Sequence, residues 1–210
     1  MKNIGKTALY LSVSCLFSLV FSYPAWCLEK KLTTSSGMTF ILVQPGSFDM
    51  GSPETEENRD KDEVRHRVIL NTAFYLQETE VTLKQWQAVM GRSMFLKRRG
   101  KPDMPVTRVS FYDTQKFIEK LNNKGHSPGI FRLPTEQEWE YACRAGTQTA
   151  YSWGDAIDCS KAVYGNNTKK HDQCTLFFAS VNIRPNGPAP VKRFLPNPWG
   201  FYDMHGNVWE

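Results

Sequence analysis

Gly200-Phe-Tyr-Asp-Met-His-Gly-Asn-Val-Trp-Glu210 is a stretch that combines turn-forming residues with large apolar side chains. Glycine, asparagine and aspartate tolerate positive φ and bond their own backbone, so the composition predicts a turn. The stretch also holds three aromatic side chains, Phe201, Tyr202 and Trp209. Side chains of this size predict that the turn is anchored in a hydrophobic core. The carboxylates of Asp203 and Glu210 are ligands that a hard cation prefers.

Upstream of this turn, capping signals predict three helices. Each signal pairs an N-cap hydroxyl with an acidic or amide residue three positions later, and the pairs are Thr82 with Gln85, Ser110 with Asp113, and Thr135 with Glu138. Such pairs satisfy amide groups at the start of a helix. Apolar residues follow each start at helical spacing, namely Trp86, Val89 and Met90, then Phe117, Ile118 and Leu121, then Trp139, Ala142 and Cys143. Gly91 is predicted to end the first helix.

Strands are predicted in the N-terminal part, where short apolar and β-branched runs occur. The predicted strands cover residues 38–43, 48–50, 66–70 and 73–76. The break at residues 44–47 predicts that the first two strands form a hairpin. Residues 51–62 carry many carboxylates but lack the regular spacing and central glycine of a calcium-binding loop. They are therefore predicted to be a solvated surface loop.

The composition is that of a globular protein, with 40% apolar and 22% charged residues, and not that of a disordered one. The formal net charge is +5, but the basic residues are scattered along the chain. The run Lys97-Arg98-Arg99 is shorter than the basic stripe of a nucleic-acid surface. We therefore expect no nucleic-acid partner, and we expect a monomer.

The N-terminus has the pattern of a secretory signal peptide. Lys2 and Lys6 precede an apolar run over residues 8–20, which is too short for a comfortable membrane span. Ala25-Trp-Cys27 places small residues where signal peptidase needs them, so residues 1–27 are predicted to be removed before Leu28. The alternative is an uncleaved anchor. We expect an exported protein, periplasmic or extracellular, with no membrane attachment after cleavage.

The cysteine pattern predicts one disulfide, since export leads to an oxidising compartment. Cys159 and Cys174, which are 15 positions apart, flank a polar loop, and a disulfide between them would contribute about 3 kcal/mol. Cys143 is then either a buried thiol on a helix or the partner of a cysteine beyond residue 210, and we favour the second. Residues 145–199 show no regular period and are predicted to be mostly loop, held in place by this disulfide, by aromatic residues and by bound cations.

Familiar catalytic motifs are absent from the sequence. It contains no Gly-rich phosphate loop, no Gly-x-Ser-x-Gly elbow and no His-Glu-x-x-His pair. The four histidines are dispersed, and none lies at metal-ligand spacing from another. These patterns therefore assign no catalytic and no cofactor-binding residue.

Five motifs occur in a fixed order: Pro45-Gly-Ser-Phe-Asp-Met-Gly-Ser52, Glu80-Val-Thr82 with Gln85-Trp86, Pro105-Val-Thr-Arg-Val-Ser110, Phe131-Arg-Leu-Pro-Thr-Glu-Gln-Glu-Trp-Glu-Tyr-Ala142 and the stretch from Gly200 to Glu210. From about residue 37 onward, this set closely resembles the formylglycine-generating enzyme (sulfatase-modifying factor) family. The resemblance implies an α+β fold of C-type-lectin-like type, rich in ordered loops. It divides the chain into the signal peptide 1–27, a polar leader 28–36, and a domain 37–210 that lacks the family's C-terminal portion.

The resemblance also implies an activity. The best-known members oxidise a cysteine of an unfolded sulfatase segment to Cα-formylglycine, with dioxygen and a copper ion held by two cysteine thiolates. Thiolates suit this role because soft sulfur selects Cu(I). The catalytic cysteines follow the family's Gly-Asn-x-Trp-Glu motif, at which this sequence stops. None of Cys143, Cys159 and Cys174 matches them, so we expect the chain alone to be inactive, with an unfolded protein or peptide as the parent protein's substrate.

A calcium site is the one site that the resemblance transfers residue by residue. It implies side-chain oxygens from Asp203 and Glu210 and backbone carbonyls from Gly206 and Val208. The alternative is a plain core turn in which Asp203 caps its own backbone. A second calcium site of the family begins at an Asn-aliphatic pair, where this chain has Val163-Tyr164. That departure argues against the second site.

Two other functions remain open for this scaffold. One is a non-catalytic, lectin-like binding module, since many family members carry the motifs without the catalytic cysteines. The other is an iron-dependent sulfoxide synthase, which carries an additional N-terminal helical domain. Residues 28–36 leave no room for that domain, so we rank this possibility last.

Overall fold

The computed structural model of the protein describes residues 29–56, 59–91, 100–123, 130–164, 172–184 and 187–209. The predicted signal peptide, the run Lys97-Arg98-Arg99 and the predicted ligand Glu210 lie outside these residues. In the part that is described, no helix has the length and apolar character needed to cross a bilayer.

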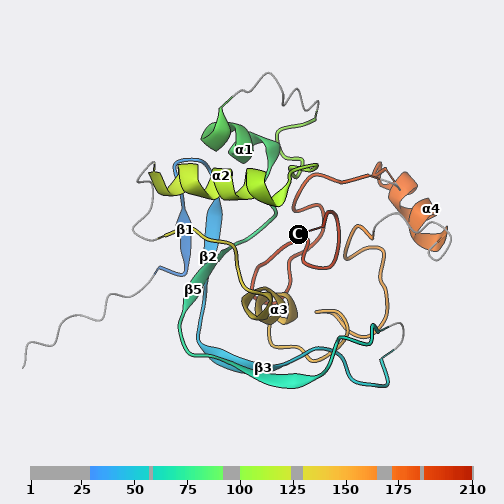
Figure 1. Ribbon diagram of the computed structural model, residues 1–210. Helices are drawn as coiled ribbons and strands as arrows, with labels where there is room; N and C mark the ends of the chain where they lie inside the picture. Colours follow the sequence, from blue (N-terminus) through green and yellow to red (C-terminus); the bar gives the residue numbers. More distant parts are fainter. Residues whose placement is uncertain are drawn as a thin grey trace, which may run out of the picture.

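Two small antiparallel sheets form the β part of the fold (Figure 1). The first has the strand order β1-β2-β5, with β1 at Lys31–Thr33, β2 at Thr39–Val43 and β5 at Phe74–Gln77. The second pairs β3, Gly46–Met50, with β4, His66–Leu70. Strand β1 lies inside the predicted leader, and its residue Leu32 pairs with Phe40 of β2.

The hairpin predicted between residues 38–43 and 48–50 is wrong, because β3 pairs with β4 and not with β2. The link between β2 and β3 is Gln44-Pro45. Two-residue hairpin loops favour turns with positive φ, which proline cannot adopt. The chain therefore leaves the first sheet at Pro45 and continues as a strand of the second.

The three predicted helices are present, as α1 at Leu83–Met90, α2 at Phe111–Asn123 and α3 at Glu136–Arg144. Thr82 and Thr135 form complete capping boxes with Gln85 and Glu138. Ser110 and Asp113 bond each other's backbone amides at the start of α2. Gly91 ends α1 with φ of 81°.

A fourth helix, α4 at Asp172–Ser180, corrects the prediction of mostly loop over residues 145–199. Its buried residues include Cys174 and Phe178, which lie one helical turn apart. Apolar residues occur on more than this one face, since Leu176 is exposed. A helix without a clear apolar stripe gives little periodic signal in the sequence.

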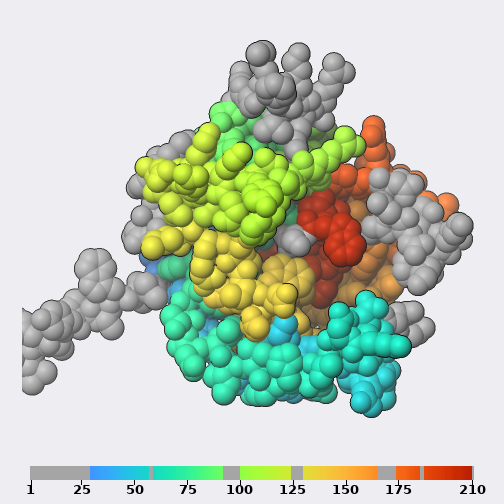
Figure 2. Space-filling model, viewed as in Figure 1, coloured from blue at the N-terminus to red at the C-terminus, as the bar shows by residue number. Residues whose placement is uncertain are grey.

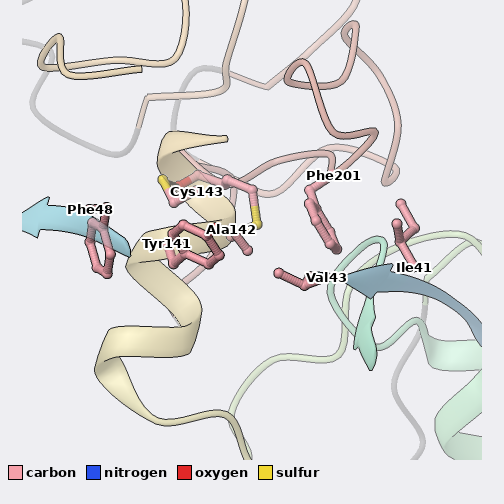
Figure 3. Packing of buried hydrophobic residues seen from close by; sticks show 8 residues of the cluster. Ile41, Val43, Phe48, Tyr141, Ala142, Cys143 and Phe201 are labelled. Carbon is pink, nitrogen blue, oxygen red and sulfur yellow. Dashed lines mark hydrogen bonds between the residues drawn. The ribbon is translucent and has the colours of Figure 1, made fainter. Parts of the chain in front are cut away.

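The main core lies between α3 and the two sheets, and the C-terminal loop contributes Phe201 and Met204 to it (Figure 3). Its buried members are Ile41, Val43, Phe48, Tyr141, Ala142, Cys143, Phe201 and Met204. In Figure 2, α2 and the C-terminal loop, drawn in yellow-green and red, lie on the same face of the molecule.

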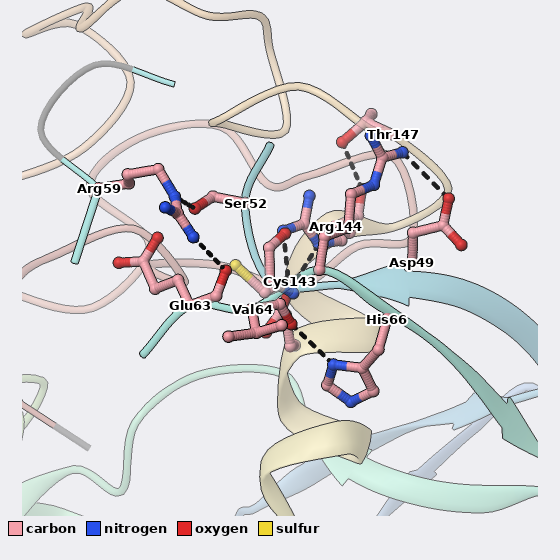
Figure 4. A network of polar contacts seen from close by, with 12 residues as sticks. Asp49, Ser52, Arg59, Glu63, Val64, His66, Cys143, Arg144 and Thr147 are labelled. Carbon is pink, nitrogen blue, oxygen red and sulfur yellow. Dashed lines mark hydrogen bonds and ion pairs between the residues drawn. The ribbon is translucent and has the colours of Figure 1, made fainter. Parts of the chain in front are cut away.

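The charged loop after β3 is docked onto α3 (Figure 4). Its first residue, Gly51, donates its N–H to Glu140 at 2.9 Å and accepts a bond from Arg144 at 2.7 Å. Arg59 holds the loop to itself through Ser52 Oγ and Glu63 O. The described ends of the loop are therefore held against α3 and against each other, while Glu54, Asp60 and Asp62 are exposed.

Candidate functional site

The C-terminal loop is anchored by Phe201 and Met204, which are 0% and 9% exposed. Asp203 and Asn207 have φ of 60° and 84°, as expected of a turn rich in Asp, Asn and Gly. The prediction that Trp209 is a third anchor is wrong, because its side chain is fully exposed. Met204 is instead the second residue of this loop that is buried in the main core.

Two asparagines fasten the loop, and the sequence gives no strong signal for either. Asn197 donates to the carbonyls of Ala142 and Cys143 at 2.8 and 3.2 Å, which satisfies two acceptors at the end of α3. Its Oδ1 accepts from the backbone of Trp199 and Phe201. Asn207 bonds both backbone groups of Ala189 through its amide.

Asp203 points its carboxyl group into the protein. Its Oδ2 accepts the Lys192 N–H at 2.9 Å, and its carboxyl group is also hydrogen-bonded to the side chain of Glu80, which is only 7% exposed. A bond between two carboxyl groups needs a shared proton, since ionised carboxylates only accept. Burial accordingly raises the pKa of Asp203 above its ordinary value.

Gly206 and Val208, which were predicted to bind calcium through their carbonyls, have different neighbours from those of the Asp203 carboxyl group. Gly206 packs so closely on Val163 that an added Cβ would lie 2.4 Å from the Val163 carbonyl oxygen. That oxygen accepts the Asn207 N–H at 2.7 Å, and Val208 is half-buried. The described residues contain no cluster of three or more His, Cys, Asp or Glu side chains arranged to hold a metal ion.

The contact at Gly206 gives a testable prediction. We expect Gly206→Ala to lower the free energy of unfolding by about 1–3 kcal/mol, because the methyl group forces two backbone segments apart. Gly187→Ala is the matched control, since its Cβ would meet only the Arg184 side chain, at 3.7 and 4.0 Å, which is ordinary van der Waals contact. Urea denaturation of both variants measures the difference. Equal stability of the two variants would contradict the close packing.

Cys143 is a buried free thiol on α3, as in the first of the two predicted alternatives, and not the one we favoured, a disulfide with a cysteine beyond residue 210. Its Sγ lies 3.4 Å from Met204 O and 3.7 and 3.8 Å from the two ring nitrogens of His205. His205 Nε2 accepts the Ser152 N–H at 3.0 Å, so the ring proton is on Nδ1. Burial lowers the pKa of His205 to about 4. A neutral imidazole with Nε2 already bonded is poorly suited to activate the thiol.

The predicted disulfide between Cys159 and Cys174 is present and ties residues 159–164 to α4. Beside this segment lies a pocket of about 300 Å³ between three stretches of the chain. Its lining residues are Ser152, Trp153, Lys161, Ala162, Leu195, Pro196, Asn197, Pro198, Phe201, Asp203, Met204 and His205. The C-terminal loop and the residues just before it supply six of these lining residues, from Asn197 to His205.

Comparisons with known proteins give a consistent result. A family model described as "Sulfatase-modifying factor enzyme 1-like domain" matches residues 28–210. Formylglycine-generating enzyme of Bos taurus is 34% identical over 114 residues, which is 52% of this chain and 27% of that protein. "Inactive C-alpha-formylglycine-generating enzyme 2" of Bos taurus is 29% identical over 157 residues, or 73% and 46%. The matches thus span less than half the length of these relatives.

The solved structure of PvdO from Pseudomonas aeruginosa has the same fold. It superposes with a TM-score of 0.66 at 24% identity, covering 86% of this chain and 73% of PvdO. The predicted α+β, loop-rich fold of C-type-lectin-like type is therefore confirmed.

Proposed function

The chain belongs to the family of sulfatase-modifying factor enzyme 1-like domains, and from this premise we propose that it is part of an exported formylglycine-generating-type protein. The parent activity is the oxidation of a protein cysteine to formylglycine, and the partner is an unfolded protein or peptide that carries this cysteine. The similarity to formylglycine-generating enzymes supports the activity. The disulfide supports export, because disulfides persist in oxidising compartments.

We propose further that these residues do not carry out the oxidation by themselves. The observation that carries this proposal is the arrangement of the described cysteines. Cys159 and Cys174 are joined to each other, and Cys143 is 6% exposed beside a neutral His205. Two thiolates that meet at one copper ion are therefore not available among the described residues, and the donor set does not fit copper.

The test uses a peptide with the cysteine of a sulfatase motif, offered to the purified protein with copper and dioxygen. Mass spectrometry of the peptide detects replacement of the thiol by an aldehyde. We expect the peptide to be recovered unchanged. Formylglycine formation that persists through repeat purification and stops when copper is chelated would overturn the proposal that this chain is inactive alone.

A non-catalytic binding module is the second candidate function. Two observations favour it: the pocket beside the C-terminal loop, and the similarity to a relative whose name marks it as inactive. Binding without turnover on a peptide or glycan array would support this candidate. An array on which the protein retains nothing, at concentrations that saturate a positive control, would count against it.

We propose calcium as the ion of the C-terminal loop, with Asp203, Gly206, Val208 and Glu210 as its ligands. The buried carboxyl pair of Asp203 and Glu80 supports this in part, because a nearby cation would offset the cost of ionising either group. The neighbouring ammonium of Lys192 is already paired with Glu78. The donor chemistry, a carboxylate with backbone carbonyls, is that of a hard cation.

Calcium is therefore expected to raise the thermal midpoint, since an ion that binds only the folded state stabilises it. Differential scanning fluorimetry with calcium or with a chelator measures the shift. In Asp203→Ala the midpoint is expected to be the same in both conditions. A wild-type midpoint that does not respond to millimolar calcium would remove calcium from the proposal.

A further inference from the structure

The pocket beside the C-terminal loop has a rigid aromatic wall. The Trp153 indole stacks on Tyr151 with ring centroids 5.1 Å apart and 8° between planes, and it meets the His205 ring at 4.8 Å. Its Nε1–H donates to Ala156 O at 3.1 Å. These contacts fix the indole in one orientation, so a ligand does not have to order it on binding.

The mouth of the same pocket is apolar and exposed. Leu195 is 78% exposed, which is unusual for a residue that lines a concave site. Pro196 and Pro198 follow it, and their fixed φ values restrict the backbone that presents it. Together with Trp153, this rim gives the pocket the kind of apolar lining that is typical of small-molecule sites.

Most polar groups of the pocket are already bonded within the protein. The Asn197 amide uses both its oxygen and its nitrogen on backbone groups. Asp203 is turned toward Lys192 and Glu80, and His205 Nε2 accepts from Ser152. A sugar or another polyhydroxylated ligand needs several open donors and acceptors, and the pocket offers few.

Lys161 is the lysine among the residues that line the pocket, and its charge also acts on the neighbouring Asp158 carboxylate. None of the ion pairs formed among the described residues involves its ammonium. Its backbone N–H donates to Asp158 O at 3.0 Å, and the disulfide at Cys159 lies two residues before it, so the chain that carries Lys161 is restrained on its N-terminal side. The pocket thus joins an aromatic wall and an apolar rim to one positive charge.

From these contacts we propose that the pocket between Trp153 and Leu195 binds a small aromatic carboxylate, with its ring against Trp153 and its carboxylate paired with Lys161. A volume of about 300 Å³ suits one ring with a short acidic arm, because it lies at the low end of ligand pockets. This deepens the binding-module candidate by naming its ligand class, and it involves no oxidation step.

Isothermal titration calorimetry of the purified protein with phenylacetate tests the proposal, with 2-phenylethanol as the neutral analogue of equal ring size. We expect phenylacetate to bind at least about tenfold more tightly than the alcohol, because an ion pair shielded by apolar groups distinguishes them. Lys161→Met is expected to abolish this preference. Lys84→Met, at an exposed lysine of α1, is the matched control and is expected to keep it.

A second variant tests the apolar rim of the pocket without changing a core residue. Leu195→Asn changes an exposed side chain, so folding is expected to be unaffected while phenylacetate binding falls several-fold. No heat of binding for phenylacetate, or equal affinity for acid and alcohol in both wild type and Lys161→Met, would overturn the proposal. Either result leaves the peptide-oxidation experiment unchanged, so the two proposals fail separately.

Discussion

Replacing Phe201 with alanine is expected to lower the free energy of unfolding by about 3–5 kcal/mol, the range for a fully buried aromatic side chain. Phe201 is 0% exposed and lies between α3 and β2, in contact with the cluster that contains Ile41 and Ala142. Its loss would leave a cavity bounded by a helix and a sheet, neither of which is free to collapse onto the other. Urea denaturation followed by circular dichroism measures the change.

Trp209→Ala is the control for this prediction, because it removes an even larger aromatic side chain from the same loop. The Trp209 indole is fully exposed, so the expected change is within about 0.5 kcal/mol. Comparing the two variants shows whether stability depends on the burial of an aromatic side chain or on its presence in the loop, and the sequence alone does not distinguish these. A loss at Trp209 equal to that at Phe201 would show that the indole is packed in solution.

The parts of the fold that follow from the sequence are those with local chemical signals. Thr82, Ser110 and Thr135 begin helices because each bonds the amide of a residue three positions later, and that geometry is written in adjacent residues. The disulfide was also predictable, since Cys159 and Cys174 flank one loop. The turn at Asp203 and Asn207 follows from residues that tolerate positive φ.

The parts that do not follow depend on contacts between distant segments. Whether β3 returns to β2 or pairs with β4 is decided across a loop of more than a dozen residues, and only Pro45 hints at the answer. Helix α4 is held by packing and by Cys174, and not by a periodic stripe. In the candidate site, the Asp203 carboxyl group meets Glu80 from a segment more than one hundred residues away.

Reduction of the disulfide is the second change with a large expected effect, a loss of about 3 kcal/mol for a sequence separation of 15. Helix α4 has only 9 residues, and a helix of this length is marginal without tertiary support. Its support comes from Val163, Phe178 and Ile183 in a small separate cluster. We therefore expect thermal melting with a reductant to show a lower midpoint, with α4 and the pocket segment lost first.

Two variants separate the disulfide from other effects of a reductant. The double variant Cys159→Ala/Cys174→Ala is expected to melt near the reduced wild type and to be insensitive to reductant. Cys143→Ala should keep the full response to reductant, because Cys143 takes no part in the bond and only loses its buried thiol contacts. Since Lys161 and Ala162 line the pocket two and three residues after Cys159, phenylacetate binding should weaken in the double variant but persist in Cys143→Ala. A double variant as stable as wild type would mean that the apolar cluster alone holds α4 in place.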